Sequence, residues 1–296
     1  MITSEFIAKH FDVGGIKKFS CARLGVASDS DEGGVLSFIA AEKYLGSINA
    51  NLSIRAVFVT MDLSVKLAEH IVPIIVDDPI WYFFSLVNYQ ASQIKHPETV
   101  IGEDCSIASS AVIAAEGVII GDGVTVEPNV VVHPGVTIGS GVLLRAGAVL
   151  GCDGYEHKRT SKGILSVLHD GKVSIGNNVE VGANTFVAKG FSYRATVVGE
   201  ETKIDALVHY AHGVQSGQRC FIVANAMIGG NVTMGDDVWV GPSSSIANRL
   251  TLGSRAFVTM GAVVTKDVGE DEKVTGNFAV PHQQFLKNLK KSMLDD

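Results

Sequence analysis

Between Val198 and Val264 one key position returns every six residues without interruption. Eleven of its twelve residues are apolar or aromatic, and a second series of mostly small or aliphatic residues runs two positions earlier, from Thr196 to Ala262. An α-helix repeats every 3.6 residues and a strand every two, whereas a hexapeptide period is the signature of a parallel β-helix. The period therefore predicts such a helix. The key residues are Val198, Ile204, Tyr210, Ser216, Ile222, Ile228, Met234, Val240, Ile246, Leu252, Val258 and Val264.

The same period begins earlier, at Ile101, and two segments interrupt it. With three flat sides per turn, the 24 key positions make about eight coils over residues 99–275. Residues 152–172 and 188–195 cannot continue the coil, so we predict that they form loops. Long loops in a compact scaffold are usually functional, which marks both segments as candidate parts of a site.

The regions flanking the repeat follow other patterns. Residues 1–98 predict a small α/β domain, with strands at 54–60 and 71–77 and helices at 62–70 and 81–93. Because the open end of a β-helix must be covered, we expect this domain to cap the first coil. Residues 276–296 predict an extension and a short amphipathic helix, with Phe285, Leu289 and Met293 on one face.

Composition narrows the class of protein. The formal charge of −7 over 296 residues argues against a protein that holds nucleic acid through phosphate contacts. No apolar stretch approaches the 18 to 20 residues of a membrane span, and no secretory signal pattern is present, which favours a cytoplasmic protein. The four cysteines are widely spaced without a CxxC pair, so we expect reduced thiols.

The 18-residue spacing of successive coils also brings candidate chemistry together. His212 lies two positions after a key residue, at a corner, and the residue one coil further on is Gly230. A base beside an exposed amide donor suits acyl transfer, in which an amine loses a proton and an oxyanion develops. Equally, His212 could be a surface turn residue. Asp205 could orient a histidine or be a solvated turn residue. His209 and His212 form an HxxH, but the pattern places no third ligand, so we expect no metal site.

Several segments carry a resemblance to a known family. Gly25-Val-Ala-Ser28, Phe38 and Lys43-Tyr44 occur in the N-terminal part, Gly151-Cys-Asp-Gly154 begins the first loop, and Asp205–Gly213 and Gly230 occur in the coils. Over nearly the whole chain these segments resemble the UDP-3-O-acylglucosamine N-acyltransferases of lipid A biosynthesis. The resemblance implies a left-handed β-helix and a homotrimer with active sites between subunits.

The same resemblance implies roles for individual residues. His212 would be the general base, with His209 and Asp205 as supporting polar groups, and the Gly230 N–H would hold the oxyanion. Phe38 and Tyr44 would bind the uracil of a UDP-amino sugar, and Asp153 and Tyr155 would belong to the substrate loop. The acyl donor would be a phosphopantetheine thioester on an acyl carrier protein or coenzyme A, with no tightly bound cofactor.

The chain departs from that family at several positions. Tyr155-Glu-His157 replaces an aromatic–glycine–tyrosine run, and Ala41, Ala188 and Arg249 replace a polar, an acidic and a histidine residue. His209 resembles the His-x-Ala-His of the related UDP-N-acetylglucosamine O-acyltransferases. These differences leave open an acetyl-CoA-dependent N-acetyltransferase of a nucleotide-linked amino sugar, in lipid A or other surface-polysaccharide synthesis. A noncatalytic β-helix scaffold is a further alternative. The lysines of the last helix, which could attract an acidic carrier protein or form a solvated face, are Lys287, Lys290 and Lys291.

Overall fold

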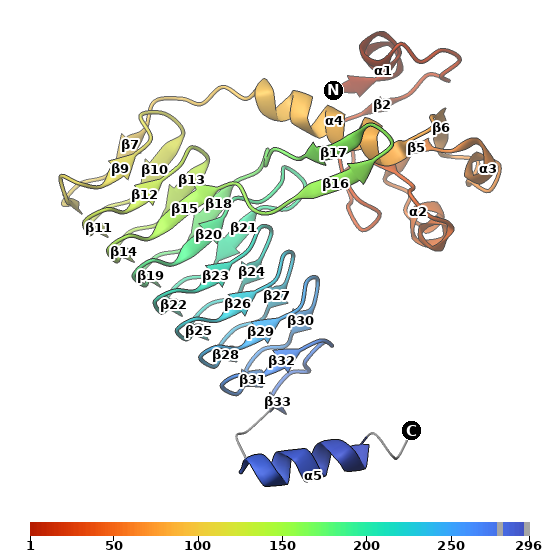
Figure 1. Cartoon of the computed structure of the whole chain (residues 1–296). Coiled ribbons are helices and arrows are strands. Elements are labelled where there is room, and N and C mark those ends of the chain that lie inside the picture. Colours follow the sequence, from red (N-terminus) through yellow and green to blue (C-terminus); the bar gives the residue numbers. More distant parts are fainter. Residues whose placement is uncertain (277–280, 293–296) are drawn as a thin grey trace.

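Most of the chain forms a parallel β-helix with three flat faces (Figure 1). The computed structural model describes residues 1–276 and 281–292. One face has eight strands, which are β7 (Val100–Ile101), β10 (Val118–Ile120), β13 (Val136–Ile138), β18 (Val173–Ile175), β21 (Thr196–Val198), β24 (Gln215–Ser216), β27 (Thr233–Met234) and β30 (Thr251–Leu252).

The other two faces repeat this arrangement. The nine-stranded face contains β8 (Ser106–Ile107), β11 (Thr125–Val126), β14 (Leu143–Leu144), β19 (Glu180–Val181), β22 (Lys203–Ile204), β25 (Phe221–Ile222), β28 (Trp239–Val240), β31 (Phe257–Val258) and β33 (Lys273–Val274). The third face, again of eight strands, contains β9 (Val112–Ile113), β12 (Val131–Val132), β15 (Val149–Cys152), β20 (Phe186–Ala188), β23 (His209–Tyr210), β26 (Met227–Ile228), β29 (Ser245–Ile246) and β32 (Val263–Val264).

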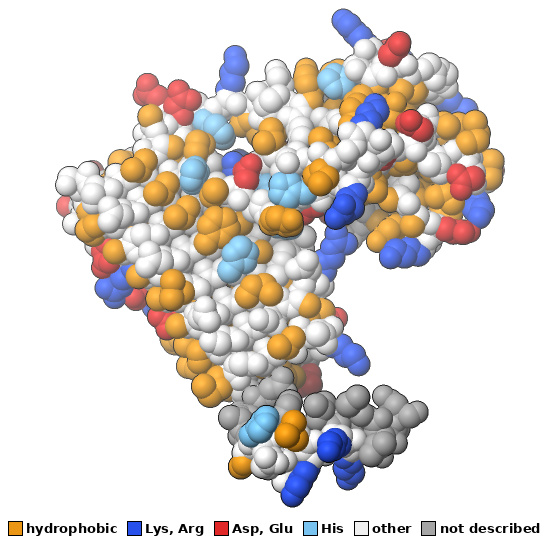
Figure 2. All heavy atoms as spheres, viewed as in Figure 1, with side chains coloured by type: hydrophobic (Ala, Val, Ile, Leu, Met, Phe, Trp, Pro, Cys, Tyr) orange, Lys and Arg blue, Asp and Glu red, His pale blue; other side chains and the backbone are white. Residues whose placement is uncertain are grey.

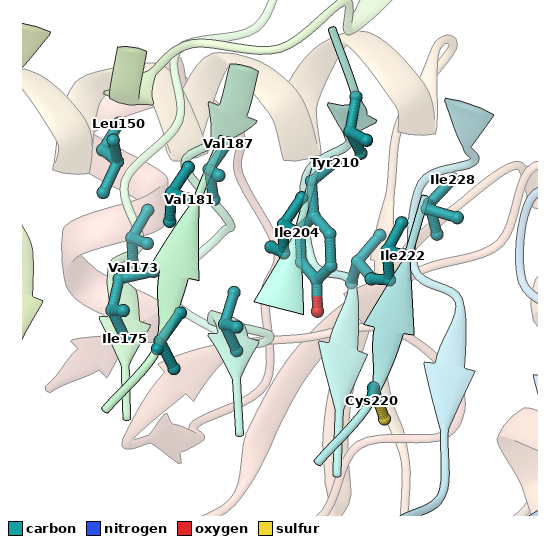
Figure 3. Close-up of a cluster of buried hydrophobic side chains, with 14 of the residues drawn as sticks. Leu150, Val173, Ile175, Val181, Val187, Ile204, Tyr210, Cys220, Ile222 and Ile228 are labelled. Atoms are coloured by element: carbon teal, nitrogen blue, oxygen red, sulfur yellow. The ribbon is translucent and has the colours of Figure 1, made fainter. Parts of the chain in front are cut away.

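The key residues predicted from the sequence line the interior of the β-helix. All twelve key residues from Val198 to Val264 are buried, and strands one coil apart pair in parallel, as Tyr210 does with Ile228. The Tyr210 ring lies among the aliphatic side chains of Ile204 and Ile222 (Figure 3), and its hydroxyl donates to the Val197 carbonyl oxygen at 2.7 Å. The predicted fold class, a left-handed parallel β-helix built from hexapeptide repeats, is confirmed.

The coils still stack on one another across the two interruptions, with one register irregularity between Leu150 and Cys152. Across the first, Val136 still pairs with Val173 and Leu150 with Val187. The inserted chain leaves the coil as an antiparallel hairpin of β16 (His157–Thr160) and β17 (Gly163–Ser166). The second interruption is a tight loop closed by a bridge between Phe191 and Arg194.

The N-terminal region is a parallel four-stranded sheet with short helices. The sheet contains β3 (Arg23–Leu24), β4 (Val35–Phe38), β5 (Ile54–Val59) and β6 (Val72–Ile75), and β1 (Ile2–Thr3) pairs separately with β2 (Ser20–Cys21). The helical segments are α1 (Ser4–Phe11), η1 (Glu42–Tyr44), α2 (Leu45–Ala50), α3 (Met61–Ser64) and α4 (Pro79–Ser92).

One predicted helix of this region is much shorter than expected. The pattern predicts a helix over 62–70, but α3 ends at Ser64 and the following residues form turns. Leu63 is buried and Leu67 and Ala68 pack on the same core without a helix between them, whereas Val65 is 80% exposed. By contrast, α4 begins where Asp78 accepts a hydrogen bond from the Trp81 amide at 2.9 Å, a favourable N-cap.

The N-terminal region packs beside the coils rather than over their end. The Asn88 side chain of α4 donates to the Ser166 carbonyl oxygen and accepts from the Leu168 amide, both at 2.8 Å. Val167 and Phe191, from the two interruptions, are buried in the same apolar cluster as the sheet. The expectation that this region caps the first coil is therefore wrong. Ile101, in that coil, is 47% exposed, and Figure 1 shows the N-terminal region beside the hairpin.

At the other end α5 (His282–Ser292) follows the last coil. Its expected apolar face of Phe285, Leu289 and Met293 lies outside the residues whose side chains the structure describes. Within the described ranges no helix combines the length and apolar character needed to cross a membrane.

Candidate active site

His212 lies at a corner of the coil, directly over a glycine of the next coil. A β-carbon added to Gly230 would lie 2.7 Å from both Cε1 and Nε2 of the imidazole. Any side chain here would force the imidazole to move, and the vertical pairing of His212 with Gly230 that the repeat predicts is present in the structure.

The Gly230 amide already has a hydrogen-bond partner. Its N–H donates to Oδ1 of Asn248, one coil further on, at 3.1 Å. The same kind of bond recurs at another corner, where the Gln218 amide donates to Asp236 at 2.9 Å. An oxyanion would have to share the Gly230 N–H with the Asn248 oxygen or displace that oxygen. The role of the Gly230 amide therefore stays a prediction.

The first interruption brings the carboxylate of Glu156 close to the imidazole of His212. Oε2 of Glu156 lies 3.4 Å from Nε2 of His212, and Glu156 also pairs with the ammonium of Lys158. The side chains of His212 and Glu156 are only 12% and 18% exposed, so water screens this pair weakly. Burial lowers the pKa of His212 below its usual value, and the charge of Glu156 opposes this effect. The imidazole is therefore held neutral near pH 7, the form that can accept a proton.

Aromatic rings enclose the other side of His212. The His169 ring stacks on Phe191 with centroids 4.4 Å apart, and both rings lie 5.5 Å from the imidazole of His212. His169 is 3% exposed, and burial lowers its pKa to about 4. Nε2 of His169 accepts a hydrogen bond from the Gly154 amide at 3.3 Å, which places this glycine of the first loop against the two histidines.

A cavity of about 600 Å³ opens between the N-terminal region, the hairpin and the coils. Phe38 and Tyr44 both line it, together with Ser28 of the N-terminal motif, Lys158 of β16 and Arg249 of a coil corner. Figure 2 shows Lys and Arg side chains along this hollow. Phe38 packs on Phe83 with centroids 4.6 Å apart and is half-buried, whereas Tyr44 is 41% exposed. An aromatic pocket rimmed by two cations suits an aromatic ring that carries an anionic group.

A second hollow of about 320 Å³ shares Ser28 and Arg249 with the first. Arg194 lines it and donates to the Gly213 carbonyl oxygen at 2.7 Å and to the Thr233 hydroxyl at 2.8 Å. Through Gly213, the residue next to His212, this arginine fixes the corner that carries the proposed base.

The other predicted site residues lie around this centre at varying distance. His209 points outward from β23 and stacks on Phe186, with centroids 5.3 Å apart. Asp153 pairs with Lys189 at 3.5 Å near the start of the loop, and Tyr155 is 86% exposed. Asp205 lies at a different corner, between β22 and β23, where its carboxylate accepts the amides of Ala206 and Ala224. Its interactions are those of a structural turn residue, and its supporting role stays a prediction.

Across residues 1–276 and 281–292 no group of three or more His, Cys, Asp or Glu side chains has the geometry to hold an ion.

The sequence predicts no role for Glu156, and it leaves open whether His169 contacts the sugar or faces solvent. Glu156 and His169 lie within or beside an insertion without a repeat, so periodicity could not place them. The available signal was chemical, because three charged or titratable residues, Glu156, His157 and Lys158, come soon after the loop glycine Gly154.

Comparison with known proteins agrees with the repeat. Residues 117–152 match the family described as bacterial transferase hexapeptide (six repeats), and residues 98–134 match the hexapeptide repeat of succinyl-transferase. Together these matches cover residues 98–152, within the repeat that forms the β-helix. A UDP-3-O-acylglucosamine N-acyltransferase of Methylobacterium sp. (strain 4-46) is 37% identical over 142 residues, which is 48% of this chain and 40% of that protein. The enzyme of the same name from Campylobacter curvus (strain 525.92) is 33% identical over 135 residues, 45% of this chain and 42% of that protein.

These matches span about two fifths of the length of the curated relatives. Among solved structures, a UDP-N-acetylglucosamine acyltransferase from Bacteroides fragilis 9343 superposes with a TM-score of 0.51 at 24% identity. That match covers 58% of this chain and 65% of the other, and it supports the β-helix fold.

Proposed function

We propose that this hexapeptide-repeat protein is an N-acyltransferase that moves an acyl group from a phosphopantetheine thioester to the amine of a UDP-linked amino sugar. The observation that carries the proposal is the place of His212, a neutral imidazole at a coil corner whose side chain is 12% exposed. Glu156 and Lys158 connect it to the cavity that Phe38 and Tyr44 line. Curated relatives that share this repeat bear the name of that activity.

The residues suit each step of such a transfer. As the sugar amine attacks the thioester carbon, the new C–N bond forms and the amine proton passes to His212. The tetrahedral intermediate then expels the thiolate, which takes up that proton, so the imidazole returns to its neutral form. The developing oxyanion needs a donor at the corner, and the Gly230 amide is our candidate despite its bond to Asn248.

The cavity suits a nucleotide portion of the substrate. Phe38 and Tyr44 would hold the uracil ring, and Lys158 and Arg249 would face the diphosphate. We place Asp153 and Tyr155 near the sugar, since they begin the loop that carries Glu156 to His212. His209 would support the base from the neighbouring strand.

The proposal extends to partners. We infer a cytoplasmic homotrimer, in which a neighbouring copy closes the site beside each His212, and an acyl carrier protein as the donor. Exposed Lys287, Lys290 and Lys291 on α5 would attract that acidic partner. Light scattering in solution tests the trimer, and a monomer would contradict it.

Product analysis tests the activity itself. UDP-amino sugars with a free amine are incubated with a long-chain acyl carrier protein or with acetyl-CoA, and the products are identified by mass spectrometry. We expect an N-acylated sugar with the carrier-protein donor and a rate about 10² to 10⁴-fold lower for His212→Ala. N-acetylation by acetyl-CoA alone would replace the donor in the proposal. No acylated product with either donor, or full activity in His212→Ala, would refute the reaction or the base.

A further inference from the structure

A chain of three charged or titratable side chains connects the large cavity to His212. Lys158 lines the cavity with its ammonium 4.5 Å from the Phe84 ring centre, and the same ammonium pairs with Glu156. The other oxygen of Glu156 lies 3.4 Å from Nε2 of His212. All three side chains are less than a third exposed, so a change of charge at one end is felt at the other.

The hairpin explains this alignment. Successive residues of a strand point to opposite faces, so Glu156 and Lys158 share one face while His157 and Arg159 lie on the other. His157 and Arg159 are exposed. The Ser166 carbonyl oxygen and the Leu168 amide bond to Asn88 of α4, which holds the hairpin at this orientation.

The charged and titratable groups that face His212 come from several elements. Glu156, on the hairpin, favours the protonated imidazole. Lys158 of the hairpin, Arg249 of the coil corner and His209 of β23 each disfavour it. His169 packs edge-on against the ring and is itself held neutral by burial. Lys158 and Arg249, two of the cations that oppose protonation, are also the two that line the cavity.

We propose that Glu156 is a positioning residue for His212 and that Lys158 links this pair to the cavity, so that a nucleoside diphosphate bound there makes His212 a stronger base. The identity of the ligand rests on the proposed function, whereas the contact between Glu156 and His212 does not.

The coupling follows from competition for one ammonium group. A diphosphate in the cavity offers Lys158 and Arg249 an anionic partner, which offsets their effect on the imidazole and releases Glu156 from Lys158. The carboxylate then acts on His212 alone and stabilises the imidazolium that forms when the amine proton arrives. His212 would thus become a stronger base only when the substrate is bound. In the empty enzyme its imidazole would stay neutral over a wider range of pH.

The experiment is a titration of His212 by NMR in the full chain with isotope-labelled histidine. The His212 signal is assigned by its loss in His212→Gln, and UDP is the cavity probe. In the free protein we expect Glu156→Gln to move the titration midpoint of His212 to lower pH and Lys158→Gln to move it to higher pH. Arg159→Gln, a neighbouring charge on the opposite face of the hairpin, should leave the midpoint in place.

Adding UDP to the wild-type protein should raise the midpoint, and Lys158→Gln should remove most of that rise. An unmoved midpoint in Glu156→Gln would overturn the positioning role. UDP that fails to bind, or binds without moving the midpoint, would overturn the link to the cavity. Both readouts are independent of product formation, so a failure of the acyltransferase assay is distinguishable from a failure here.

Kinetics supply the second arm. Glu156→Gln should lower kcat by about tenfold or more with little change in KM, because an imidazole without its carboxylate is poorly oriented and its cation is less stabilised. A purely structural role would instead lower thermal stability and leave the pH profile of kcat/KM in place.

Discussion

The position of the proposed base, His212, depends on the absence of a β-carbon at Gly230. An added β-carbon would lie 2.7 Å from Cε1 and Nε2 of His212 and 3.4 Å from Cδ2. Ordinary carbon contacts lie at about 3.5 to 4.0 Å, so in Gly230→Ala the imidazole must retreat by roughly 1 Å. A displacement of that size at a reacting group costs about a hundredfold in rate.

Gly230→Ala changes the position of the His212 imidazole and leaves the other features of the site in place. The backbone of Gly230 is not in the left-handed region, and alanine keeps the amide that bonds to Asn248. We therefore expect kcat/KM to fall about a hundredfold while the melting temperature changes little, because the three atoms closest to the added carbon all belong to the side chain of His212 and none to the backbone.

The assay measures kcat/KM by product formation and the melting temperature by calorimetry. Gly14→Ala is the matched control, since nothing lies within 4 Å of a β-carbon there. Retention of wild-type kcat/KM in Gly230→Ala would refute the reasoning, because it would mean that the position of His212 over Gly230 has no part in the reaction.

The remaining predictions concern stability and binding. Tyr210→Phe should lower the free energy of unfolding by about 0.5 to 1.5 kcal/mol in chemical denaturation, because the Val197 carbonyl loses its 2.7 Å hydrogen bond; an unchanged stability would contradict this. His169 has a folded-state pKa of about 4, below its ordinary value of 6.5, so only the unfolded chain binds this proton between those values. Stability should therefore fall as the pH drops from 6.5 toward 4, by up to about 1.4 kcal/mol per pH unit. His169→Asn should remove that part of the slope, and equal slopes would refute it. Tyr44→Ala should weaken UDP binding about tenfold or more in calorimetry while leaving the melting temperature in place, since Tyr44 is 41% exposed; equal affinities would remove Tyr44 from the cavity's role.

The coils could be predicted from the sequence because one rule repeats. In the unbroken run each strand pairs with the strand 18 residues on, so Tyr210 pairs with Ile228 and His212 meets Gly230 by translation alone. The period by itself therefore indicates which residues meet at a corner, including the glycine beside the proposed base.

The 18-residue spacing does not apply to the hairpin or to the N-terminal region, so it could not predict their contacts. Glu156 reaches His212 only because the hairpin is held by Asn88, whose partner Ser166 lies 78 residues later in the chain. The cavity joins Phe38, Lys158 and Arg249 from three separate segments, and nothing local to any of them signals the others. The cap expected over the first coil failed for the same reason, since packing between distant surfaces decided where the sheet lies.

The unbroken pairing across the first insertion has a consequence for how such proteins diversify. Val136 and Val173 stack as neighbours although the chain between them makes a detour through the hairpin. The β-helix should therefore tolerate replacement of the inserted segment by one of different length or chemistry. A graft that replaces residues 153–170 should leave the coils intact while changing which group acts on His212. New specificity in this lineage could then arise by swapping one segment, without any cost to the stacked core.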